Sequence, residues 1–362
     1  MFSRVSTFFQ RLQVHSTSPR PIVSPELQQL LRDTSRSFYL TLRILPAPVR
    51  PQIGLAYLLA RASDTIADTE LVPWEGRLEA LEAFQQRIQG SRSDPVDLRP
   101  LLGPASSGHS DAERKLLEQL ESALALLPGQ SEEDQRDIRA VLATITAGQA
   151  LDLRRFGSVS PQNPGSLHHN AELDDYTYRV AGCVGEFWTR LTRRHCFPSA
   201  PLREDQFLND GIRFGKGLQL INILRDLPRD LRLGRCYFPA SSLAAVGLTP
   251  RDLLDPTQEF RFRPIYDEWL ALAQDHLAAG WRYTNTIPKG HARLRLACAW
   301  PILIGARTLV KLRQGRVLAA DGRIKVGRKE VRSILLGTLL RLPFHGPWEA
   351  QFQNALSSFH RD

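Results

Sequence analysis

The residues of this sequence most able to do chemistry form two copies of the pattern Asp-x-x-x-Asp: Asp64 with Asp68, and Asp226 with Asp230. Each pair lies in a stretch with helical apolar spacing, where residues four apart lie on one face. Two carboxylates held so close repel each other unless a cation lies between them. Mg²⁺ suits this position because it binds one or two carboxylates and completes its coordination with water and substrate phosphate. The two pairs therefore predict a magnesium and diphosphate site, although one isolated pair would more often be solvated helix surface.

Further polar residues lie on the same helix faces. Arg61 precedes the first pair by one turn and Tyr57 by two turns, while Asn222 precedes the second pair by one turn and Arg225 adjoins it. The two arginines are interpreted either as salt-bridge partners of the aspartates or as cations that stabilise a departing diphosphate, and both roles can coexist. A polar stripe on two helices that are otherwise apolar predicts a wet cavity between them.

Pro228 lies inside the second aspartate pair. Proline removes a backbone donor and disfavours helical geometry at the residue before it, here Leu227. The sequence therefore predicts either a helix that ends near Asp226 and restarts at Pro228, or a helix that is kinked there. The four-residue geometry is predicted less firmly for this pair than for the first.

The elements that must position these residues are helices. Apolar spacing near three and four dominates the chain, and convincing alternating strand runs are few. It recurs over the ranges 25–45, 48–69, 75–90, 111–127, 131–155, 172–195, 204–230, 263–286, 290–316 and 328–341. We predict one all-helical domain over residues 25–341, a flexible N-terminal arm at 1–24 and a C-terminal tail at 342–362.

Six stretches, in order along the chain, resemble the squalene and phytoene synthase family, the head-to-head prenyl transferases, and most closely its bacterial-type squalene synthases. They lie at residues 35–39, 57–68, 148–152, 176–185, 219–230 and 234–239, and a weaker likeness continues to about 335. The resemblance implies an all-α fold, a single-domain isoprenoid synthase helical bundle around a central cavity. It also implies an enzyme that acts on prenyl diphosphates with Mg²⁺.

The resemblance implies roles for individual residues as well. Tyr176 becomes the leading candidate for proton handling at a carbocation, although a tyrosine on a buried helix is most often a core residue. Arg36 belongs to a segment that clamps diphosphate, where a guanidinium matches phosphate oxygens; the alternative is a surface arginine. The catalytic candidates are Tyr176, Asp64, Asp68, Asp226 and Asp230, of which the four aspartates are the metal candidates. The substrate-binding candidates are Ser35, Arg36, Ser37, Tyr57, Arg61, Gln149, Asp152, Asn222, Arg225 and Tyr237.

The reaction implied by the resemblance joins two farnesyl diphosphates through a cyclopropyl diphosphate. Squalene synthases then reduce this intermediate with NADPH, whereas phytoene and dehydrosqualene synthases lose a proton instead. No Gly-x-Gly-x-x-Gly follows a strand, so a Rossmann site is not indicated. Residues 322–330 loosely resemble the basic segment that contacts the cofactor phosphate in squalene synthases, with a one-residue offset, which makes Lys325 and Arg328 the NADPH candidates. We predict a squalene synthase, with a phytoene or dehydrosqualene synthase as the alternative.

Two other classes fit the sequence less well. A head-to-tail synthase or a terpene cyclase would also hold diphosphate with acidic helices, but the Val-Ala-Gly and Gly-Arg-x-Tyr-Phe-Pro stretches at residues 180–182 and 234–239 speak against it. A catalytically silent relative would usually have lost one aspartate pair, and this chain has both. The nine histidines form no visible triad with serine or cysteine, so nucleophilic hydrolysis has no support.

Charge is concentrated in residues 311–341, which hold nine Lys or Arg against two acidic residues, +7 of the overall +9. The segment has no Phe, Tyr or Trp, so it does not resemble a single-strand nucleic-acid binder. An anionic cofactor or peripheral contact with an anionic membrane fits better. No apolar run reaches eighteen residues, no signal peptide is recognised, and the four cysteines have no metal-ligand spacing. We predict a cytoplasmic protein, peripheral at most to the inner face of the membrane, and leave its oligomeric state open.

Overall fold

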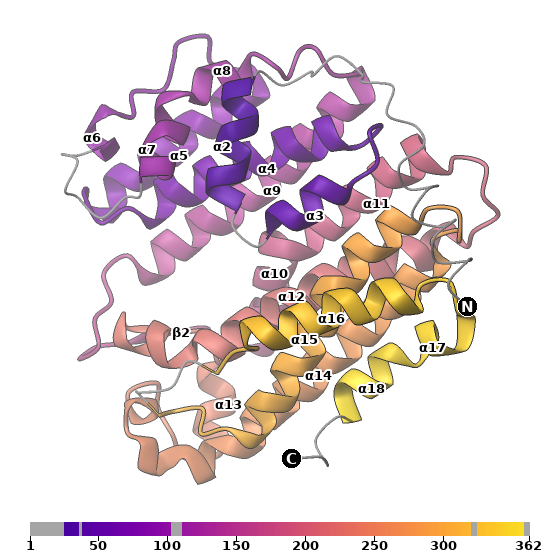
Figure 1. The fold of residues 1–362 in the computed structure, drawn as a ribbon. Coiled ribbons are helices and arrows are strands. Elements are labelled where there is room, and N and C mark those ends of the chain that lie inside the picture. Colours follow the sequence, from indigo (N-terminus) through magenta and orange to yellow (C-terminus); the bar gives the residue numbers. More distant parts are fainter. Residues whose placement is uncertain (1–24, 36–37, 103–110, 320–323, 358–362) are drawn as a thin grey trace.

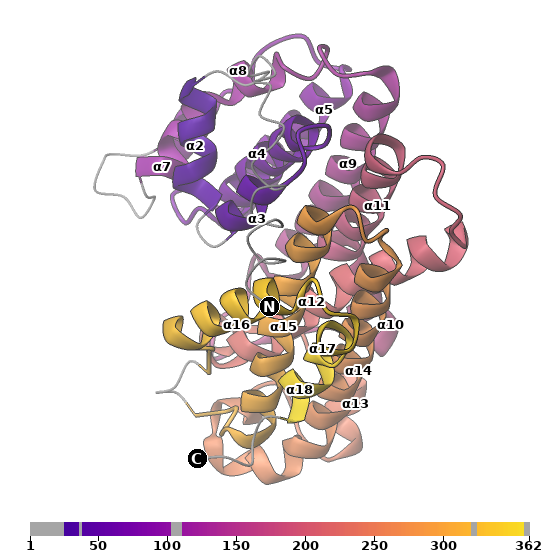
Figure 2. The ribbon, with the colours of Figure 1, turned by 45° about the vertical axis from the view of Figure 1, so that its right-hand side comes forward.

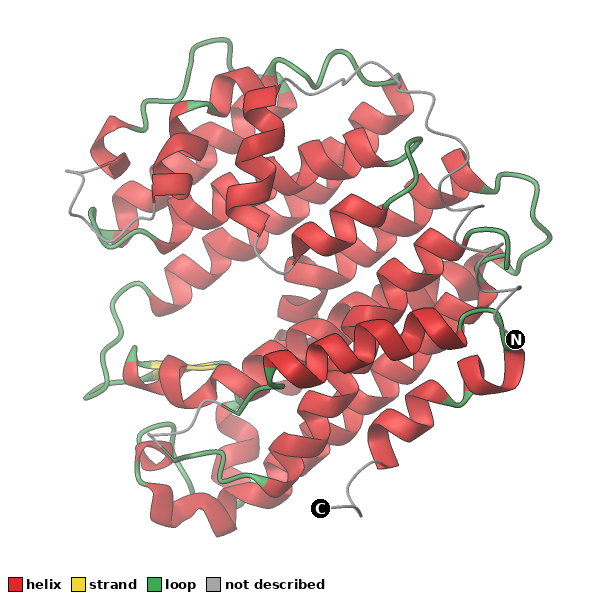
Figure 3. Cartoon of the chain, in the orientation of Figure 1, coloured by secondary structure: helices red, strands yellow, loops and turns green. Residues whose placement is uncertain are grey.

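The computed structural model of the chain describes residues 25–35, 38–102, 111–319 and 324–357. Within these ranges almost every regular element is a helix (Figure 3). The exception is a two-residue parallel pair, in which Gly165 lies opposite Arg235 and Ser166 opposite Cys236. The structure confirms the predicted all-α fold class. None of the helices in the described ranges is both long enough and apolar enough to cross a membrane.

The helices gather in two halves that correspond roughly to the two halves of the chain (Figures 1 and 2). The first half contains α2 (Pro25–Ser35), α3 (Phe38–Ile44), α4 (Arg50–Asp68), α5 (Trp74–Gln89), α6 (Arg99–Leu102), α7 (Asp111–Glu118), α8 (Leu120–Leu124) and α9 (Glu132–Phe156). Next come β1 (Gly165–Ser166), α10 (Asn170–Thr177), the π-helical turn η1 (Tyr178–Gly182) and α11 (Cys183–Cys196). The second half contains α12 (Glu204–Arg232), β2 (Arg235–Cys236), α13 (Ala240–Ala245), the 3₁₀ turns η2 (Asp252–Leu254) and η3 (Pro256–Gln258), α14 (Glu259–Thr286), α15 (Ala292–Gln314), α16 (Arg328–Arg341), α17 (His345–Glu349) and α18 (Gln351–Ser357).

Small residues let the central helices approach closely. A Cβ added to Gly185 of α11 would lie 2.0 Å from the carbonyl oxygen of Gly211 on α12, and one added to Gly215 would lie 2.1 Å from that of Ala181. The backbones therefore touch at this crossing, and any larger side chain would push α11 and η1 away from α12. This contact fixes the segment that carries Tyr176 against the helix that carries the second aspartate pair.

The helix α12 continues through Pro228 to Arg232. Of the two predicted alternatives, an end near Asp226 is therefore wrong, and both aspartates of the second pair lie on one helix. Pro228 has no N–H to bond the carbonyl of Leu224, four residues earlier. That carbonyl instead accepts a hydrogen bond from the hydroxyl of Tyr266 on α14, at 3.0 Å. A tertiary contact thus satisfies the group that proline leaves open, which sequence spacing could not reveal.

The segment after Arg341 is helical as far as Ser357, and α18 packs on α15. Trp348 of α17 stacks on Trp281 of α14 with ring centroids 5.4 Å apart, and the Trp281 indole donates to the carbonyl of Glu349 at 3.2 Å. These contacts join residues 345–357 to the second half of the bundle. The predicted arm at 1–24 lies outside the described residues.

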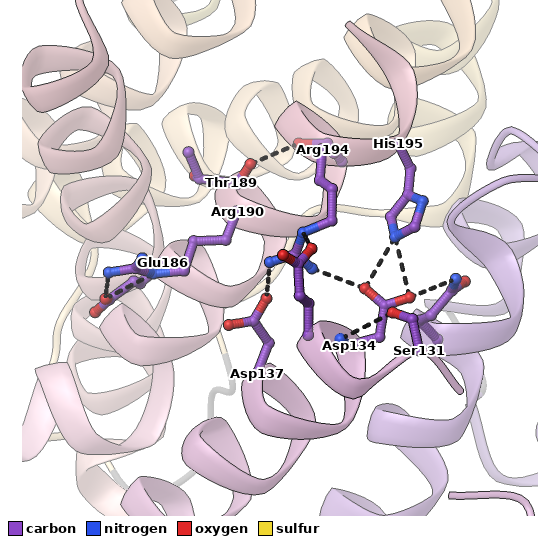
Figure 4. Close-up of polar contacts among 11 residues, drawn as sticks. Ser131, Asp134, Asp137, Glu186, Thr189, Arg190, Arg194 and His195 are labelled. Atoms are coloured by element: carbon purple, nitrogen blue, oxygen red, sulfur yellow. Dashed lines mark hydrogen bonds and ion pairs between the residues drawn. The ribbon is translucent and has the colours of Figure 1, made fainter. Parts of the chain in front are cut away.

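A buried polar network joins the first turn of α9 to the last turns of α11 (Figure 4). The Asp134 carboxylate, whose side chain is 3% exposed, accepts from Arg194 at 2.7 Å and lies 2.9 Å from Nε2 of His195. It also accepts from Gln52 of α4 at 3.1 Å. Arg194 contacts Asp137 as well, at 2.6 Å. Burial by itself would raise the pKa of Asp134, but the hydrogen bonds from His195 and Gln52 hold that pKa below its ordinary value.

Replacing Asp134 by alanine is therefore expected to lower the free energy of unfolding by about 2 kcal/mol at pH 7, because it removes the buried acceptor that Arg194, His195 and Gln52 share. A carboxyl with a lowered folded-state pKa stabilises the fold above its ordinary pKa, and this contribution is lost as pH falls through the lowered value. The difference in free energy of unfolding between wild type and variant, measured by urea denaturation, should therefore shrink below about pH 4. Asp97→Ala, which removes an exposed pair with Arg99, should leave the free energy of unfolding nearly unchanged, because solvent screens exposed ion pairs. Equal effects of the two changes would contradict the role given to the network.

Candidate active site

A cavity of about 230 Å³ lies where the end of α4, the last turns of α9, α10 with η1, and β2 meet. Six of the residues predicted from the sequence line it: Asp64, Asp68, Gln149, Asp152, Tyr176 and Tyr237. Apolar side chains, including Leu153, Phe156 and Val180, form other parts of the wall. Residues that are more than 170 positions apart in the sequence, such as Asp64 and Tyr237, thus meet in one concave polar site with an apolar margin. This is the usual form of a small-molecule site.

The first aspartate pair lies on the last turns of α4. The Asp64 side chain is 47% exposed because it faces the cavity, and its Oδ1 accepts a hydrogen bond from Nε2 of Gln149 at 2.6 Å. Arg61 lies 3.6 Å from the other oxygen of Asp64. The protein around the cavity nevertheless shields this carboxylate from bulk water. That desolvation, reinforced by the negative charge of Asp68, raises the pKa of Asp64 to about 6. The pKa of Asp68 is also raised, chiefly by desolvation, against the opposing charges of nearby arginines.

The second pair lies near the end of α12. Asp226 forms a two-point ion pair with the adjacent Arg225, at 2.6 Å and 3.1 Å. Desolvation and the charge of Asp226 raise the pKa of Asp230 to about 7. Arg229 and Arg235 oppose this rise, and both also oppose the rise at Asp68. One carboxylate of each pair, Asp68 on α4 and Asp230 on α12, is therefore influenced by the same two arginines, although the second pair does not itself line the cavity described above.

Two stacked tyrosines and a carboxylate form the inner polar part of the cavity. The rings of Tyr176 and Tyr237 are 4.8 Å apart, and the Tyr176 hydroxyl donates to the Tyr237 hydroxyl at 3.3 Å. The Tyr237 hydroxyl donates in turn to the Asp152 carboxylate, at 3.0 Å and 3.2 Å. Burial, and next the charge of Asp152, raise the pKa of both phenols well above 10. Burial raises the pKa of Asp152 to about 6.

Local backbone structure explains how these groups are held. Tyr176 lies at the end of α10, and η1, a π-helical turn of the kind often found at functional sites, follows it directly. Tyr237 follows β2, which is reached through a turn at Gly234 with φ of +76°. Only glycine fits there, because a Cβ would also lie 2.6 Å from the backbone of Ser160.

The structure does not bring every predicted residue to the cavity. Ser35 is the last residue of α2, and Arg36 and Ser37 lie outside the described residues. The Tyr57 hydroxyl donates to the carbonyl of Thr34 at 3.3 Å, which ties α4 to α2. Arg61 pairs with Glu113 of α7 as well as with Asp64, as the salt-bridge interpretation expects.

Three further predicted residues lie at the surface. Asn222 is exposed on α12, and its amide lies 3.4 Å from the side-chain oxygen of Gln219. Lys325 precedes α16 and Arg328 begins it; both are exposed, and neither lines the cavity. Their assignments therefore stay predictions.

Two cavity arginines were missed. Arg235 lines the cavity, and its positive charge opposes the raised pKa values of Asp68, Asp152 and Asp230, which come from three different helices. A signal existed, because Arg235 belongs to the stretch 234–239. Arg77 of α5 donates to the carbonyl of Ala67 at 3.0 Å, and its buried Nε has no hydrogen-bond partner within the described residues. Nothing in the sequence around Arg77 marked it, because only the packing of α5 brings it to the cavity.

Comparison with known proteins agrees with the resemblance found in the sequence. The squalene/phytoene synthase family model matches residues 31–330. A presqualene diphosphate synthase of Zymomonas mobilis is 28% identical over 315 residues, which cover 85% of this chain and 89% of that protein. A bifunctional lycopene cyclase/phytoene synthase of Colletotrichum graminicola is 26% identical over 81% of this chain and 46% of that protein, so this chain spans about half the length of such bifunctional relatives.

Among solved structures, a ligand complex of TcSQS superimposes with a TM-score of 0.72 at 20% identity, over 93% of both chains. This likeness supports the helical fold. The family model covers most of the chain and includes the segments that build the cavity. The chain belongs to the squalene/phytoene synthase family.

Proposed function

We propose that this protein joins two molecules of farnesyl diphosphate head to head, with Mg²⁺, to form a cyclopropyl diphosphate. The observation that carries the proposal is a cavity that contains the first acidic pair, Arg235 and Tyr176, with Asp230 of the second pair influenced by the same arginines as Asp68. Carboxylates can hold Mg²⁺, arginines can hold diphosphate, and a phenol can handle a proton. Prenyl condensation needs all three.

The donor set fits Mg²⁺. All four candidate ligands are carboxylates, and like-charge neighbours contribute to raising the pKa values of Asp64 and Asp230, so a cation beside them would relieve an existing repulsion. Within the described residues no group of three or more His, Cys, Asp or Glu forms a complete metal cage. Mg²⁺ does not require one, because it commonly takes only one or two carboxylates and completes its shell with water and phosphate. When bound, it would neutralise charge on the departing diphosphate.

The protein's own residues would perform the remaining tasks. Arg61, Arg77 and Arg235 would bind diphosphate oxygens, and the unpartnered Nε of Arg77 is available for one of them. Tyr176 would take a proton from the carbocation that follows condensation. The apolar wall residues Phe156 and Val180 would keep water from trapping that cation as an alcohol.

For the second stage we propose NADPH-dependent reduction to squalene. The relatives include proteins named for presqualene diphosphate and for phytoene, so phytoene or dehydrosqualene formation without NADPH is the competing outcome. Purified protein incubated with farnesyl diphosphate and Mg²⁺, with and without NADPH, should yield the cyclopropyl diphosphate in both cases and squalene only with NADPH. Mass spectrometry identifies these products. A linear, longer diphosphate would contradict head-to-head condensation. If the cyclopropyl diphosphate forms but no squalene appears in the presence of NADPH, only the proposed reduction is contradicted.

Changing both Lys325 and Arg328 to alanine tests the proposed cofactor segment. If these exposed side chains bind the NADPH phosphate, the double variant should form cyclopropyl diphosphate at the normal rate while squalene formation falls. Arg332→Ala, also exposed on α16, serves as the control for a general loss of positive charge. Chromatographic quantification of both products over time provides the measurement.

The same variants test the proposed contact with an anionic membrane. A membrane role predicts unchanged products in detergent but weaker, salt-sensitive binding to phosphatidylserine vesicles, because each basic residue near such a surface contributes about 1 kcal/mol. Unchanged products together with unchanged vesicle binding would make Lys325 and Arg328 ordinary surface residues.

A further inference from the structure

Three side chains from separate parts of the chain form a directed hydrogen-bonded line in the cavity. Tyr176 of α10 donates its hydroxyl proton to Tyr237, and Tyr237 donates its own to Asp152 of α9. The separations are 3.3 Å between the hydroxyl oxygens and 3.0 Å from the second hydroxyl to the nearer carboxylate oxygen. All three residues line the cavity. The line therefore begins and ends at the space where substrate would lie.

The acceptor at the end of the line determines its direction. An ionised carboxylate has no proton to donate, so the Tyr237 hydroxyl must donate to Asp152, and its oxygen is then free to accept from Tyr176. The Tyr176 proton consequently points into the protein, along the line. The lone pairs of the Tyr176 oxygen are left for a donor in the cavity. Asp152 thus makes Tyr176 an acceptor of a proton, although it does not touch Tyr176 in the hydrogen-bonded line.

We propose that Tyr237 and Asp152 extend the proton route of the condensation, with Tyr237 as the relay and Asp152 as the final acceptor. This inference rests on the proposed function. A C–H bond of the cationic intermediate breaks, and its electron pair closes the cyclopropane ring. The released proton bonds to the Tyr176 oxygen while the Tyr176 hydroxyl proton moves to Tyr237 and the Tyr237 hydroxyl proton moves to Asp152. The charges balance, because one cation and one carboxylate become two neutral groups.

The environment of the two phenol groups favours passing the proton along the line over forming a stable phenolate. Both phenols have pKa values well above 10 because they are buried, so a free phenolate is unfavourable and the three transfers must be nearly concerted. Asp152 is a better terminus, since its pKa of about 6 makes it ionised at neutral pH yet more basic than an ordinary aspartate. Its charged surroundings are Arg235, Arg155, Asp68 and Asp230. Because Asp152 lines the cavity, it can return the proton to water after product leaves.

The competing interpretation is that Tyr237 and Asp152 only hold Tyr176 in position. Stacking of the two rings at 4.8 Å already orients Tyr176, and Tyr237→Phe would keep that stacking while it removes the relay oxygen. Asp152→Asn keeps the shape but replaces the carboxylate with an amide, whose oxygen can accept a hydrogen bond but cannot take up the proton. Asp152→Glu restores a carboxylate and should recover part of the activity. These three changes separate proton transfer from packing.

We expect Tyr237→Phe and Asp152→Asn to lower the single-turnover rate of cyclopropyl diphosphate formation about 10- to 100-fold, the usual scale for a partner behind an active-site group. The KM for farnesyl diphosphate should change little. Diphosphate release should continue, so part of the substrate should appear as alcohols: farnesol where water traps the farnesyl cation, and a condensed thirty-carbon alcohol where it traps the cation that fails to lose its proton. Tyr178→Phe is the matched control, because its hydroxyl bonds Glu186 outside the cavity.

A solvent isotope effect provides the second measurement. The carbon-bound proton does not exchange with water, but the hydroxyl protons of Tyr176 and Tyr237 do. Relay transfer therefore predicts slower ring closure in D₂O for the wild type and the Tyr178→Phe control, and loss of this difference in Tyr237→Phe. Circular dichroism melting checks that each variant is folded, and Tyr237→Phe keeps the test decisive should Asp152→Asn not fold.

Normal rates in folded Tyr237→Phe and Asp152→Asn, or a wild-type rate that is equal in H₂O and D₂O, would overturn the relay while leaving the condensation proposal intact. Failure of the wild type to release diphosphate from farnesyl diphosphate would instead overturn the proposed function, and the relay with it.

Discussion

Asp64→Asn and Asp68→Asn are expected to reduce formation of the cyclopropyl diphosphate by about 10³ or more. Removing a candidate Mg²⁺ ligand forfeits several kcal/mol of charge stabilisation on the departing diphosphate, and each 1.4 kcal/mol corresponds to a factor of ten in rate. Asparagine preserves the shape of each side chain, so the loss would arise from charge rather than from packing. Product is measured by radiolabelled farnesyl diphosphate at saturating Mg²⁺.

The stability of the Asp64→Asn variant should move in the opposite direction. The folded-state pKa of Asp64, about 6, lies above the ordinary aspartate value, so the ionised carboxylate opposes folding at any pH above 6. At pH 7 and without metal, Asp64→Asn should unfold at the same temperature as the wild type or at a higher one. The difference should vanish below about pH 4, where both folded and unfolded states bind the proton.

Asp267→Asn provides a matched control for the first pair, because Asp267 is 46% exposed and also pairs with an arginine, but lies on α14 away from the cavity lining. It should keep full activity. Asp226→Asn and Asp230→Asn should repeat the loss, since α12 carries both carboxylates on one continuous helix. Full activity in Asp64→Asn or Asp68→Asn would remove the first pair from the metal site.

Tyr176→Phe is expected to lower turnover by roughly 10² to 10⁴, the contribution of a positioned acid or base, while the KM for farnesyl diphosphate stays near the wild-type value. The phenylalanine ring can still stack on Tyr237, so the change removes the hydroxyl that faces the cavity and little else. Single-turnover kinetics with product analysis separates loss of the chemical step from loss of binding.

A second buried tyrosine distinguishes catalysis from stability. Tyr283 is 1% exposed, and its hydroxyl lies 3.2 Å from that of Thr189, outside the cavity. Tyr283→Phe removes a buried hydrogen bond and should lower the melting temperature without lowering turnover. A Tyr176→Phe enzyme as active as Tyr283→Phe would make Tyr176 a packing residue.

Local sequence was sufficient for much of the fold. The helix that carries Asp64 and Asp68 was predicted over residues 48–69 and observed over Arg50–Asp68, because apolar spacing near 3.6 residues reports directly which face is buried. The same periodicity placed the two carboxylates of each pair on one face. For α12 the sequence left two alternatives open, an end near Asp226 or a kinked helix, since the effect of Pro228 depends on whether another group satisfies the carbonyl of Leu224, and Tyr266 lies 42 residues away in sequence.

The sequence by itself determined the helical class, the two aspartate pairs and the family to which the chain belongs, because these depend on spacing and short motifs. Only the tertiary structure decided which polar groups share the cavity. Arg77 enters it through the packing of α5, and the line from Tyr176 through Tyr237 to Asp152 joins three parts of the chain whose contact no local pattern encodes. The physical reason is that helix periodicity arises from neighbours within a few residues, whereas the distances between side chains on different helices follow from close packing of the whole bundle.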